Sequence, residues 1–327
     1  MKPGEIKEIF STRKKNPPVP NNSFLLPTDR KAAFVIENGK VVRISLKKCS
    51  KCLTPFSYLN DVCRNGRAYL KFGCMGCGRC YALKIRHASD PIANRIVREF
   101  MINLELSRHN IAVNRALYYE TNDFCSAAAF NNCSLIATRH SQRTIMYQQW
   151  GAELIRTLEQ AHRIGIIHRD VNPENILINS DGHPLLWEWD LAVTQIPRAT
   201  ALTSTPPNLV GTPNYASVES FEGIKAHCVD IKALAYSLVE LAGKELPWRH
   251  CATLEEIYQE KKKKDFAPHL SEEFDLFFNY AISLKPTDII DYDQMVLWLC
   301  MSSKTIQGNK RCQLFEGDEC TKKKIRE

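Results

Sequence analysis

The chain lacks any apolar run that approaches the ~18 residues needed to span a bilayer. Its first stretch, residues 1–22, also lacks the apolar segment found in signal peptides. We therefore expect that the chain does not associate with a membrane. We also expect it to fold in a reducing compartment, the cytoplasm or the nucleus. The 13 cysteines, an odd number, are then interpreted as thiols or metal ligands and not as disulfides.

A strong charge imbalance is absent too. There are 44 basic and 36 acidic residues, a formal net charge of +8, and part of the excess lies in lysine runs at 261–264 and 322–324. Such runs are usually solvated faces or tails, which disfavours nucleic-acid binding, whereas an acidic protein substrate would suit the same charge. The apolar fraction of 44% is ordinary for a globular protein and argues against wholesale disorder.

The pattern of apolar residues changes along the chain. Residues 1–31, rich in proline, asparagine and lysine, are expected to form a flexible arm. Between 32 and 140 short β-rich runs dominate, with one helix predicted from about residue 91. From 141 to 305 helical spacing dominates, and residues 306–327 form a basic tail. A β-rich front followed by a helix-rich back predicts an α+β protein with two lobes.

Individual elements can be predicted from local patterns. An Asn38-Gly39 pair between two β-rich runs suits a type I′ hairpin turn. Further strands are expected at 67–72 and 80–85, near 114–120 and near 132–138, with a hairpin from 176–178 and 185–187. Helices are expected at 145–163, at 230–241 and between 274 and 299.

The most specific local pattern is the run His168-Arg169-Asp170-Val171-Asn172-Pro173-Glu174-Asn175. It resembles the catalytic loop of eukaryotic-type protein kinases, H-R-D-x-x-x-x-N. In that family phosphoryl transfer depends mainly on positioning and charge neutralisation. The resemblance implies that Asp170 orients the attacking hydroxyl and accepts its proton, while Asn175 holds a magnesium ion. It also implies that His168 and Arg169 brace the loop.

Other positions of the kinase pattern follow in the expected order. Asp190-Leu191-Ala192 stands where kinases carry D-F-G, so that Asp190 would chelate the magnesium ion bridging the β- and γ-phosphates. The run Tyr81-Ala82-Leu83-Lys84-Ile85 resembles the V-A-I-K strand, so that Lys84 would contact the α- and β-phosphates. Glu99, in the predicted helix, would hold Lys84 by an ion pair. The resemblance covers roughly residues 60–300 and implies a two-lobed serine/threonine kinase that uses ATP and Mg²⁺ on protein substrates.

The back half resembles the casein kinase 1 and vaccinia-related kinase group in particular. Gly211-Thr212-Pro213-Asn214-Tyr215-Ala216-Ser217 matches its G-T-x-x-Y-A-S, and Leu246-Pro247-Trp248 matches its L-P-W. The resemblance implies that Asp230 bonds to the backbone of the catalytic loop and that Glu219 anchors the lower lobe. Because the tryptophan before Asp-Leu-Ala also resembles a fungal kinase group, the subfamily stays open.

Three departures from the kinase pattern keep a second hypothesis open. Asn172 replaces the lysine that usually meets the γ-phosphate, and it can donate a hydrogen bond but supplies no charge. In the phosphate-covering loop Gly66 aligns with the third glycine, but Asp61 and Cys63 stand at the first two positions. Ala192 replaces the glycine of D-F-G, which restricts the backbone. The alternative is a pseudokinase that acts as a protein-binding or regulatory scaffold.

The front half also carries two C-x-x-C pairs, Cys49 with Cys52 and Cys74 with Cys77, separated by 21 residues. Four such thiolates can form a closed tetrahedral site for structural zinc. We therefore predict a zinc-stapled insertion at 49–80, with a set of reduced core cysteines as the alternative. A zinc-dependent nucleic-acid-binding module is the third functional hypothesis, ranked below the other two because only the cysteines and the basic tail favour it.

Overall fold

The computed structural model describes the backbone of residues 22–25, 32–37, 40–46, 56–64, 67–74, 80–87, 94–113, 116–121, 125–132, 140–179, 181–194, 209–263 and 265–306. Side chains are described for Lys84 and for residues 95–113, 146–179, 181–194, 209–263 and 265–301. Within these ranges, no helix combines the length and the apolar character that crossing a membrane requires.

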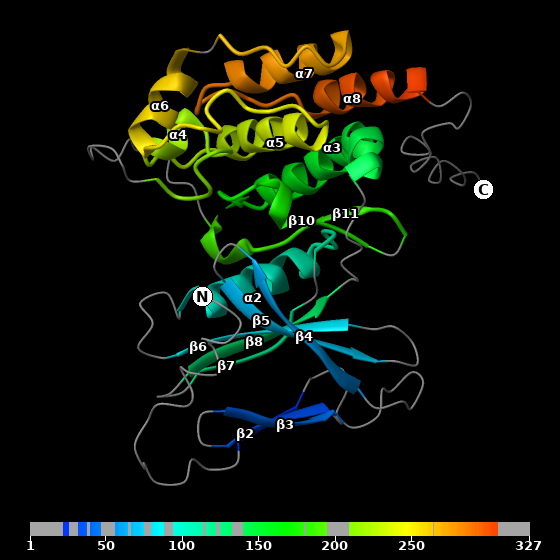
Figure 1. Ribbon diagram of the computed structural model, residues 1–327, viewed down its shortest axis with the longest axis vertical. Helices are drawn as coiled ribbons and strands as arrows, with labels where there is room; N and C mark the ends of the chain where they lie inside the picture. The colour runs from blue at the N-terminus through cyan, green and yellow to red at the C-terminus, as the bar shows by residue number, and fades with distance from the viewer. Residues whose placement is uncertain are drawn as a thin grey trace, which may run out of the picture.

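The front lobe is built on an antiparallel sheet with one helix packed against it (Figure 1). The sheet has five strands in the order β4-β5-β6-β8-β7. Their bounds are Phe56–Arg64 (β4), Arg67–Cys74 (β5), Cys80–His87 (β6), Ala116–Thr121 (β7) and Cys125–Asn132 (β8). The predicted strands at 67–72 and 80–85 are confirmed as the pair β5 and β6. Strand β8 includes Asn132, and the rest of the strand predicted near 132–138 lies outside the described residues.

Helix α2 (Asn94–Arg108) packs against β7 and β8 and also reaches the back lobe. Its buried stripe runs through Ile96, Phe100 and Leu106 at helical spacing. Glu99 lies on the same stripe and is buried with it. A carboxylate on a buried helical face needs a partner, and the position of this helix determines which partner it meets.

A smaller sheet precedes the main one. It contains β1 (Asn22–Leu25), β2 (Ala32–Glu37) and β3 (Lys40–Leu46) in that order. The hairpin predicted around Asn38-Gly39 is confirmed, since β2 and β3 pair antiparallel with Glu37 opposite Lys40. Strand β1 lies within the arm that was expected to be flexible, and it pairs with β2.

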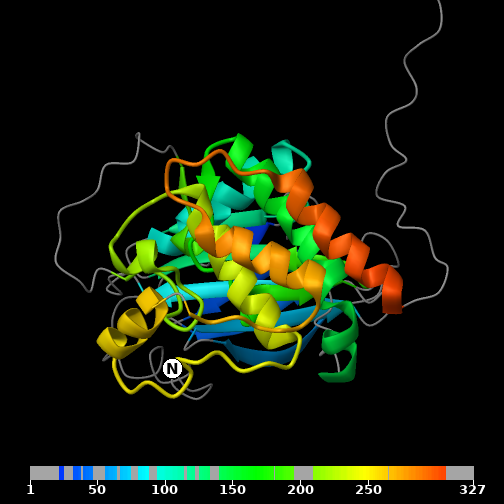
Figure 2. The ribbon, with the colours of Figure 1, turned by 90° about the horizontal axis from the view of Figure 1, so that it is seen from above.

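The back lobe is helical and lies above the front lobe in the view of Figure 1, so that its helices cover the strands when the molecule is seen from above (Figure 2). Its helices are α3 (His140–Arg163), α4 (Val218–Phe221), α5 (His227–Leu241), α6 (Leu254–Lys263), α7 (Glu272–Ser283) and α8 (Tyr292–Ile306). Helix α5 is buried almost all round, as expected for an apolar helix at the centre of a lobe. The helical stretch predicted between 274 and 299 is divided into α7 and α8, because Pro286 cannot donate the backbone hydrogen bond that a continuous helix needs.

Two short strand pairs lie between the lobes and frame the polar loops. Strand β9 (Ile166–Ile167) pairs with β12 (Val193–Thr194), and β10 (Ile176–Ile178) forms the predicted hairpin with β11 (Pro184–Leu186). The loop between β9 and β10 and the turn between β11 and β12 therefore lie side by side. These two segments carry Asp170, Asn175 and Asp190, three of the residues singled out in the sequence.

Candidate active site

The loop between β9 and β10 is held in place by a buried carboxylate of helix α5. Asp230 accepts hydrogen bonds from the backbone nitrogens of His168 and Arg169, each at 2.7 Å. Although burial acts to raise it, the pKa of Asp230 is lowered, because His162 donates to the carboxylate, the charges of His162 and His168 favour its ionised form, and the Arg169 amide donates to it. Arg169 has a left-handed backbone (φ 69°), which the two bonds to Asp230 stabilise. The predicted contact between Asp230 and the catalytic loop is confirmed.

His168 and Arg169 link this loop to the turn after β11, as expected. The Nε2 atom of His168 lies 2.9 Å from the carbonyl oxygen of Trp187, and its Nδ1 accepts from the backbone nitrogen of Asp170 at 3.2 Å. Because Nδ1 accepts, the ring proton belongs on Nε2, which donates to Trp187. Arg169 Nε donates to the carbonyl oxygen of Leu191 at 2.9 Å.

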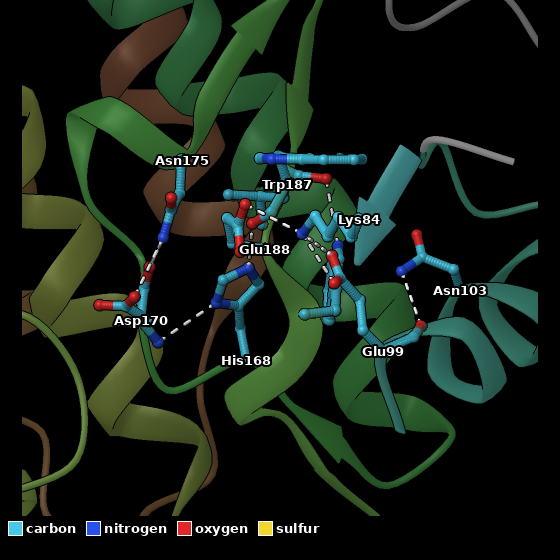
Figure 3. Close-up of polar contacts among 10 residues, drawn as sticks. Lys84, Glu99, Asn103, His168, Asp170, Asn175, Trp187 and Glu188 are labelled. Atoms are coloured by element: carbon cyan, nitrogen blue, oxygen red, sulfur yellow. Dashed lines mark hydrogen bonds and ion pairs between the residues drawn. The ribbon is translucent and has the colours of Figure 1, made fainter. Parts of the chain in front are cut away.

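Asp170 lies in the centre of a hydrogen-bond cluster that leaves its two oxygens unequal. Its Oδ1 accepts from the nitrogen (2.8 Å) and hydroxyl (2.7 Å) of Thr212 and from the Asn172 amide (3.1 Å). Its Oδ2 accepts from the Asn175 amide at 3.1 Å (Figure 3). Three donors fill the accepting capacity of Oδ1, so Oδ2 is the oxygen better able to accept a hydrogen bond from an incoming hydroxyl.

Asn172 is committed to the loop itself. Its Oδ1 accepts from the backbone nitrogens of Glu174 and Asn175, each at 3.0 Å, and so caps the short 3-10 helix Pro173–Asn175. Its amide nitrogen donates to Asp170 and to the Thr212 hydroxyl, and the residue is only 1% exposed. The hydrogen bond expected of Asn172 is therefore present, but its acceptors are protein groups that orient Asp170.

Lys84, on strand β6, forms the predicted ion pair with Glu99 of helix α2. The Lys84 Nζ atom is 2.7 Å from each carboxylate oxygen of Glu99, and both residues are buried. A second carboxylate, Glu188, places its Oε1 at 2.9 Å from the same Nζ, which also lies 4.2 Å from the ring centroid of Trp187 (Figure 3). The lysine is therefore fixed from both lobes at once.

Carboxylates outnumber cations around Lys84. Burial raises the pKa of Glu99 to about 8, and Glu188 and Asp190 add to that increase while Lys84 opposes it. The pKa of Lys84 is raised although burial acts to lower it, because Glu188, Glu99 and Asp190 all favour the ammonium form. Glu188 and Asp190 act as two negative charges beside one ammonium, which leaves an excess of negative charge even when Glu99 carries a proton and suits the binding of a cation.

In the turn after β11 the sequence predicted a role for Asp190, but in the structure the carboxylate that forms an ion pair with Lys84 is that of Glu188. Glu188 has φ 62° and ψ 56°, a left-handed conformation that is uncommon outside glycine, and this conformation brings its side chain to Lys84. Asp190, the predicted magnesium ligand, follows in the 3-10 turn Trp189–Leu191, is buried, and acts on Lys84 through its charge. Ala192 has an ordinary extended backbone (φ −62°, ψ 151°), so no glycine is required there.

The segment from Gly211 to Ser217 lies against the catalytic loop. Gly211 has φ 105°, and a Cβ atom at this position would lie 2.5 Å from the carbonyl oxygen of Arg169. Only glycine fits such a conformation at that distance. Past this segment Glu219 forms an ion pair with Lys232 of α5, which confirms that Glu219 anchors the lower lobe.

Some predicted site residues fall outside the described part of the chain. Gly66, Cys49, Cys52 and Cys77 are not described, and Cys74 is described only as backbone of β5. The zinc and phosphate-loop assignments therefore stay predictions. Among the side chains that the structure does describe, no group of three or more His, Cys, Asp and Glu residues is arranged to hold a metal ion.

Sequence reasoning did not assign roles to three residues of this cluster. The sequence predicts no contact of Thr212 or Trp187 with the other site residues, and it favours Asp190 over Glu188. The alternation of Trp187, Glu188, Trp189 and Asp190 puts two acidic residues at alternate positions. That alternation was the available signal that either carboxylate could face the lysine.

Comparisons with known proteins identify relatives of this chain. Residues 74–296 match the model of the protein kinase domain family. The serine/threonine-protein kinase PkaB of Streptomyces coelicolor is 31% identical over 169 residues, 47% of this chain and 40% of that protein. The cAMP-dependent protein kinase catalytic subunit 3 of Drosophila melanogaster is 32% identical over 162 residues, 48% of this chain and 25% of that protein. Serine/threonine-protein kinase D of Synechocystis is 25% identical over 215 residues, 61% of this chain and 40% of that protein. The chain spans less than half the length of each of these relatives.

Proposed function

Because the chain belongs to the protein kinase family, with residues 74–296 matching the family domain, we propose that it transfers the γ-phosphoryl group of ATP to serine or threonine hydroxyls of proteins. The observation that carries this proposal is the buried ion pair between Lys84 and Glu99, with Nζ–O distances of 2.7 Å. A lysine taken out of water and fixed by a helix of the same lobe is suited to receive phosphate oxygens. The relatives' names point to the same reaction.

The catalytic loop supplies the proton acceptor for this transfer. In the proposed reaction the substrate hydroxyl oxygen forms a bond to the γ-phosphorus, and the bond from that phosphorus to the β–γ bridging oxygen breaks, releasing ADP. The hydroxyl proton passes to Asp170, whose Oδ2 has the larger remaining capacity as an acceptor. Thr212 and Asn172 keep the carboxylate from rotating, because both hold Oδ1.

Protein kinases generally use ATP together with Mg²⁺. The residues around Lys84 fit such an ion in charge and donor type, because Glu188 and Asp190 are buried carboxylates beside it and magnesium prefers oxygen ligands. Asn175, through its amide oxygen, and Asp190 or Glu188, through a carboxylate, would hold it. The ion would supply neutralisation of the phosphate charge, while Lys84 would contact the α- and β-phosphates.

A second candidate is a pseudokinase that binds or regulates another protein. It is favoured by Asn172, which stands where kinases usually place a lysine and is turned inward onto Asp170 and the loop backbone. Loss of one charge-assisted contact to phosphate would weaken the site by about 1.5–3 kcal/mol. We rank this candidate second because Lys84, Glu99, Asp170 and Asn175 have the residue types and contacts that transfer needs.

The remaining assignments are proposals that rest on the sequence. Substrates rich in acidic residues would suit the net charge of +8, and the lack of a long apolar run supports a location in the cytoplasm or the nucleus. The two C-x-x-C pairs support a structural zinc ion held by Cys49, Cys52, Cys74 and Cys77. Metal analysis is expected to find about one zinc per chain, and less than about half an equivalent would contradict the zinc site.

Radiolabel transfer tests the main proposal. Purified protein is incubated with γ-labelled ATP and magnesium, with casein and the chain itself as acceptors. Wild type is compared with Asp170→Asn, which keeps the size of the side chain but removes the proton acceptor. Label that disappears in the variant supports the kinase. Equal label in both samples, or none in folded wild type, would overturn the proposal and favour the pseudokinase.

A further inference from the structure

Lys261 lies in the lysine run 261–264, which the charge pattern assigns to a solvated face. In the structure this interpretation is wrong for Lys261, which is only 3% exposed and points inward from the end of helix α6. Its neighbour Lys262 is exposed, as expected. One member of an ordinary surface run is therefore inside the back lobe.

The ammonium group of Lys261 is surrounded by carbonyl oxygens of a single segment. Its Nζ atom donates to the carbonyl oxygens of Pro213 (2.9 Å), Asn214 (2.9 Å) and Ala216 (2.5 Å). An ammonium has three N–H donors, and these three acceptors use all of them. The neutral amine has only two, so this arrangement is specific to the charged form.

Aromatic rings complete the surroundings of the same ammonium. The Lys261 Nζ atom lies 4.7 Å from the ring centroid of Trp248, 4.8 Å from that of Tyr236 and 5.8 Å from that of Phe221. Ring faces at these distances attract a cation, most strongly when water is excluded. Trp248 also donates from its indole nitrogen to the carbonyl oxygen of Asn214 at 2.8 Å. This bond joins the cage of three aromatic rings to the segment 213–216 that Lys261 contacts.

No carboxylate within the described residues forms an ion pair with Lys261, so nothing offsets its burial by opposite charge. Burial lowers the pKa of Lys261 for that reason. The carbonyls and rings act in the opposite direction, because they bind the ammonium form. A methionine would fill this apolar cage without the desolvation of a charge, which indicates that the charge serves the segment it holds.

That segment leads directly to the catalytic aspartate. The backbone nitrogens of Tyr215 and Ala216 donate to the carbonyl oxygen of Thr212, at 3.0 and 2.9 Å. Thr212 in turn donates twice to Oδ1 of Asp170, at 2.8 and 2.7 Å. An unbroken series of hydrogen bonds therefore runs from Lys261 through residues 212–216 to Asp170.

We propose that Lys261 is a positioning residue, which clamps the backbone of residues 213–216 so that Thr212 keeps Asp170 oriented toward the incoming hydroxyl. The consequence for phosphoryl transfer rests on the proposed function, whereas the clamp itself can be tested without activity. Lys261 does not touch the reacting groups. Its removal should therefore lower kcat and leave the KM for ATP unchanged.

The test compares Lys261→Met, which keeps the length of the side chain but removes its donors, with Lys262→Met as the matched surface control. Hydrogen–deuterium exchange of a peptide spanning 209–217 reports the clamp, and initial rates on casein report kcat and KM. We expect Lys261→Met to speed exchange at Tyr215 and Ala216 and to lower kcat, each by about tenfold or more. Lys261→Arg, which keeps a cation with N–H donors, should restore part of the protection from exchange and part of kcat. Exchange and kcat within about twofold of the control would overturn the proposal.

The two proposals can fail separately. Wild type that transfers no phosphoryl group would overturn the proposed function. Hydrogen–deuterium exchange would still test the clamp, because faster exchange in Lys261→Met supports it and unchanged exchange overturns it. If Lys261→Met shows no cooperative melting, Lys261→Gln takes its place, because glutamine lacks the charge and one of the three N–H donors, so that exchange at Tyr215 and Ala216 should still be faster than in wild type. Exchange in Lys261→Gln equal to that of wild type would overturn the clamp.

Discussion

Lys84 and Glu188 form an ion pair, with Nζ and Oε1 2.9 Å apart, between strand β6 of the front lobe and the turn after β11. Lys84 is thus held between Glu99 and a second glutamate two residues before Asp190. The left-handed backbone of Glu188 aims its side chain at the lysine. This contact raises the question of which carboxylate, Glu188 or Asp190, faces a magnesium ion.

The first prediction distinguishes the roles of Glu188 and Asp190 in binding magnesium. Because Glu188 makes the close contact with Lys84, we expect Glu188→Gln to lower kcat by about tenfold or more and to raise the magnesium concentration needed for half-maximal rate. The measurement is a magnesium titration of the transfer rate for Glu188→Gln, Asp190→Asn and wild type. Glu245→Gln, at an exposed pair with His250, is the control for loss of one negative charge. A Glu188→Gln titration that matches this control, with activity lost in Asp190→Asn, would return the role to Asp190 alone.

The second prediction concerns pH and nucleotide binding. The pKa of Glu99 is about 8 in the folded chain and about 4.3 in an unfolded one. The folded state therefore binds this proton more readily than the unfolded state does, and this contribution to stability falls as the pH rises from about 4.3 to 8. A divalent cation would replace that proton.

We therefore expect the rise in melting temperature caused by magnesium with a non-hydrolysable ATP analogue to be larger at pH 8 than at pH 6. Melting curves at both pH values, with and without the ligand, measure this difference. Glu188→Gln, which removes one of the competing carboxylates, should reduce it. A shift that is equal at both pH values, or larger at pH 6, would contradict the charge excess inferred around Lys84.

The third prediction concerns the support of the catalytic loop. His227 stacks on His162, with ring centroids 4.4 Å apart, and His162 contacts Asp230. Burial, and then the neighbouring His162, lower the pKa of His227 to about 4, from about 6.5 in the unfolded chain. The unfolded state binds the proton more readily, so stability present above pH 6.5 is lost as the pH falls toward 4.

Urea unfolding at pH 7.5 and pH 5 measures this loss. We expect His227 to contribute about 1 kcal/mol of the difference, after allowance for its partial exposure. His227→Gln should therefore be less sensitive to acid than wild type. His250→Gln, at an exposed histidine, should behave as wild type. An equal acid effect in all three proteins would show that His227 is not the responsible group.

The sequence predicted the contacts that depend on residue type at fixed motif positions, and missed those that depend on tertiary geometry. Lys84, Glu99 and Asp230 were placed correctly because each lies on a regular strand or helix, whose direction fixes the side chain. Glu188 was missed because its left-handed backbone depends on packing between the lobes. Lys261 was misassigned because a run of charges gives no sign that one helical position turns inward. Membership of the casein kinase 1 group stays a prediction.

The fourth prediction compares alanine substitutions at two glycines that differ in what an added Cβ atom would contact. Gly182 (φ 89°) and Gly211 (φ 105°) both have left-handed backbones, but a Cβ at Gly182 would have no atom within 4 Å, whereas at Gly211 it would meet the Arg169 carbonyl oxygen at 2.5 Å. Gly182→Ala therefore measures backbone strain alone, about 1 kcal/mol in urea unfolding. Gly211→Ala adds a clash with the catalytic loop.

We expect Gly211→Ala to lose about 2–4 kcal/mol of stability and to lower kcat by about tenfold or more even under conditions where it is fully folded. The physical reason is that relief of the clash must move either Arg169 or the adjoining Thr212, and both lie next to Asp170. Gly182→Ala should keep the wild-type kcat. If the two alanine variants lose stability and activity equally, the contact between Gly211 and the Arg169 carbonyl does not position the catalytic loop.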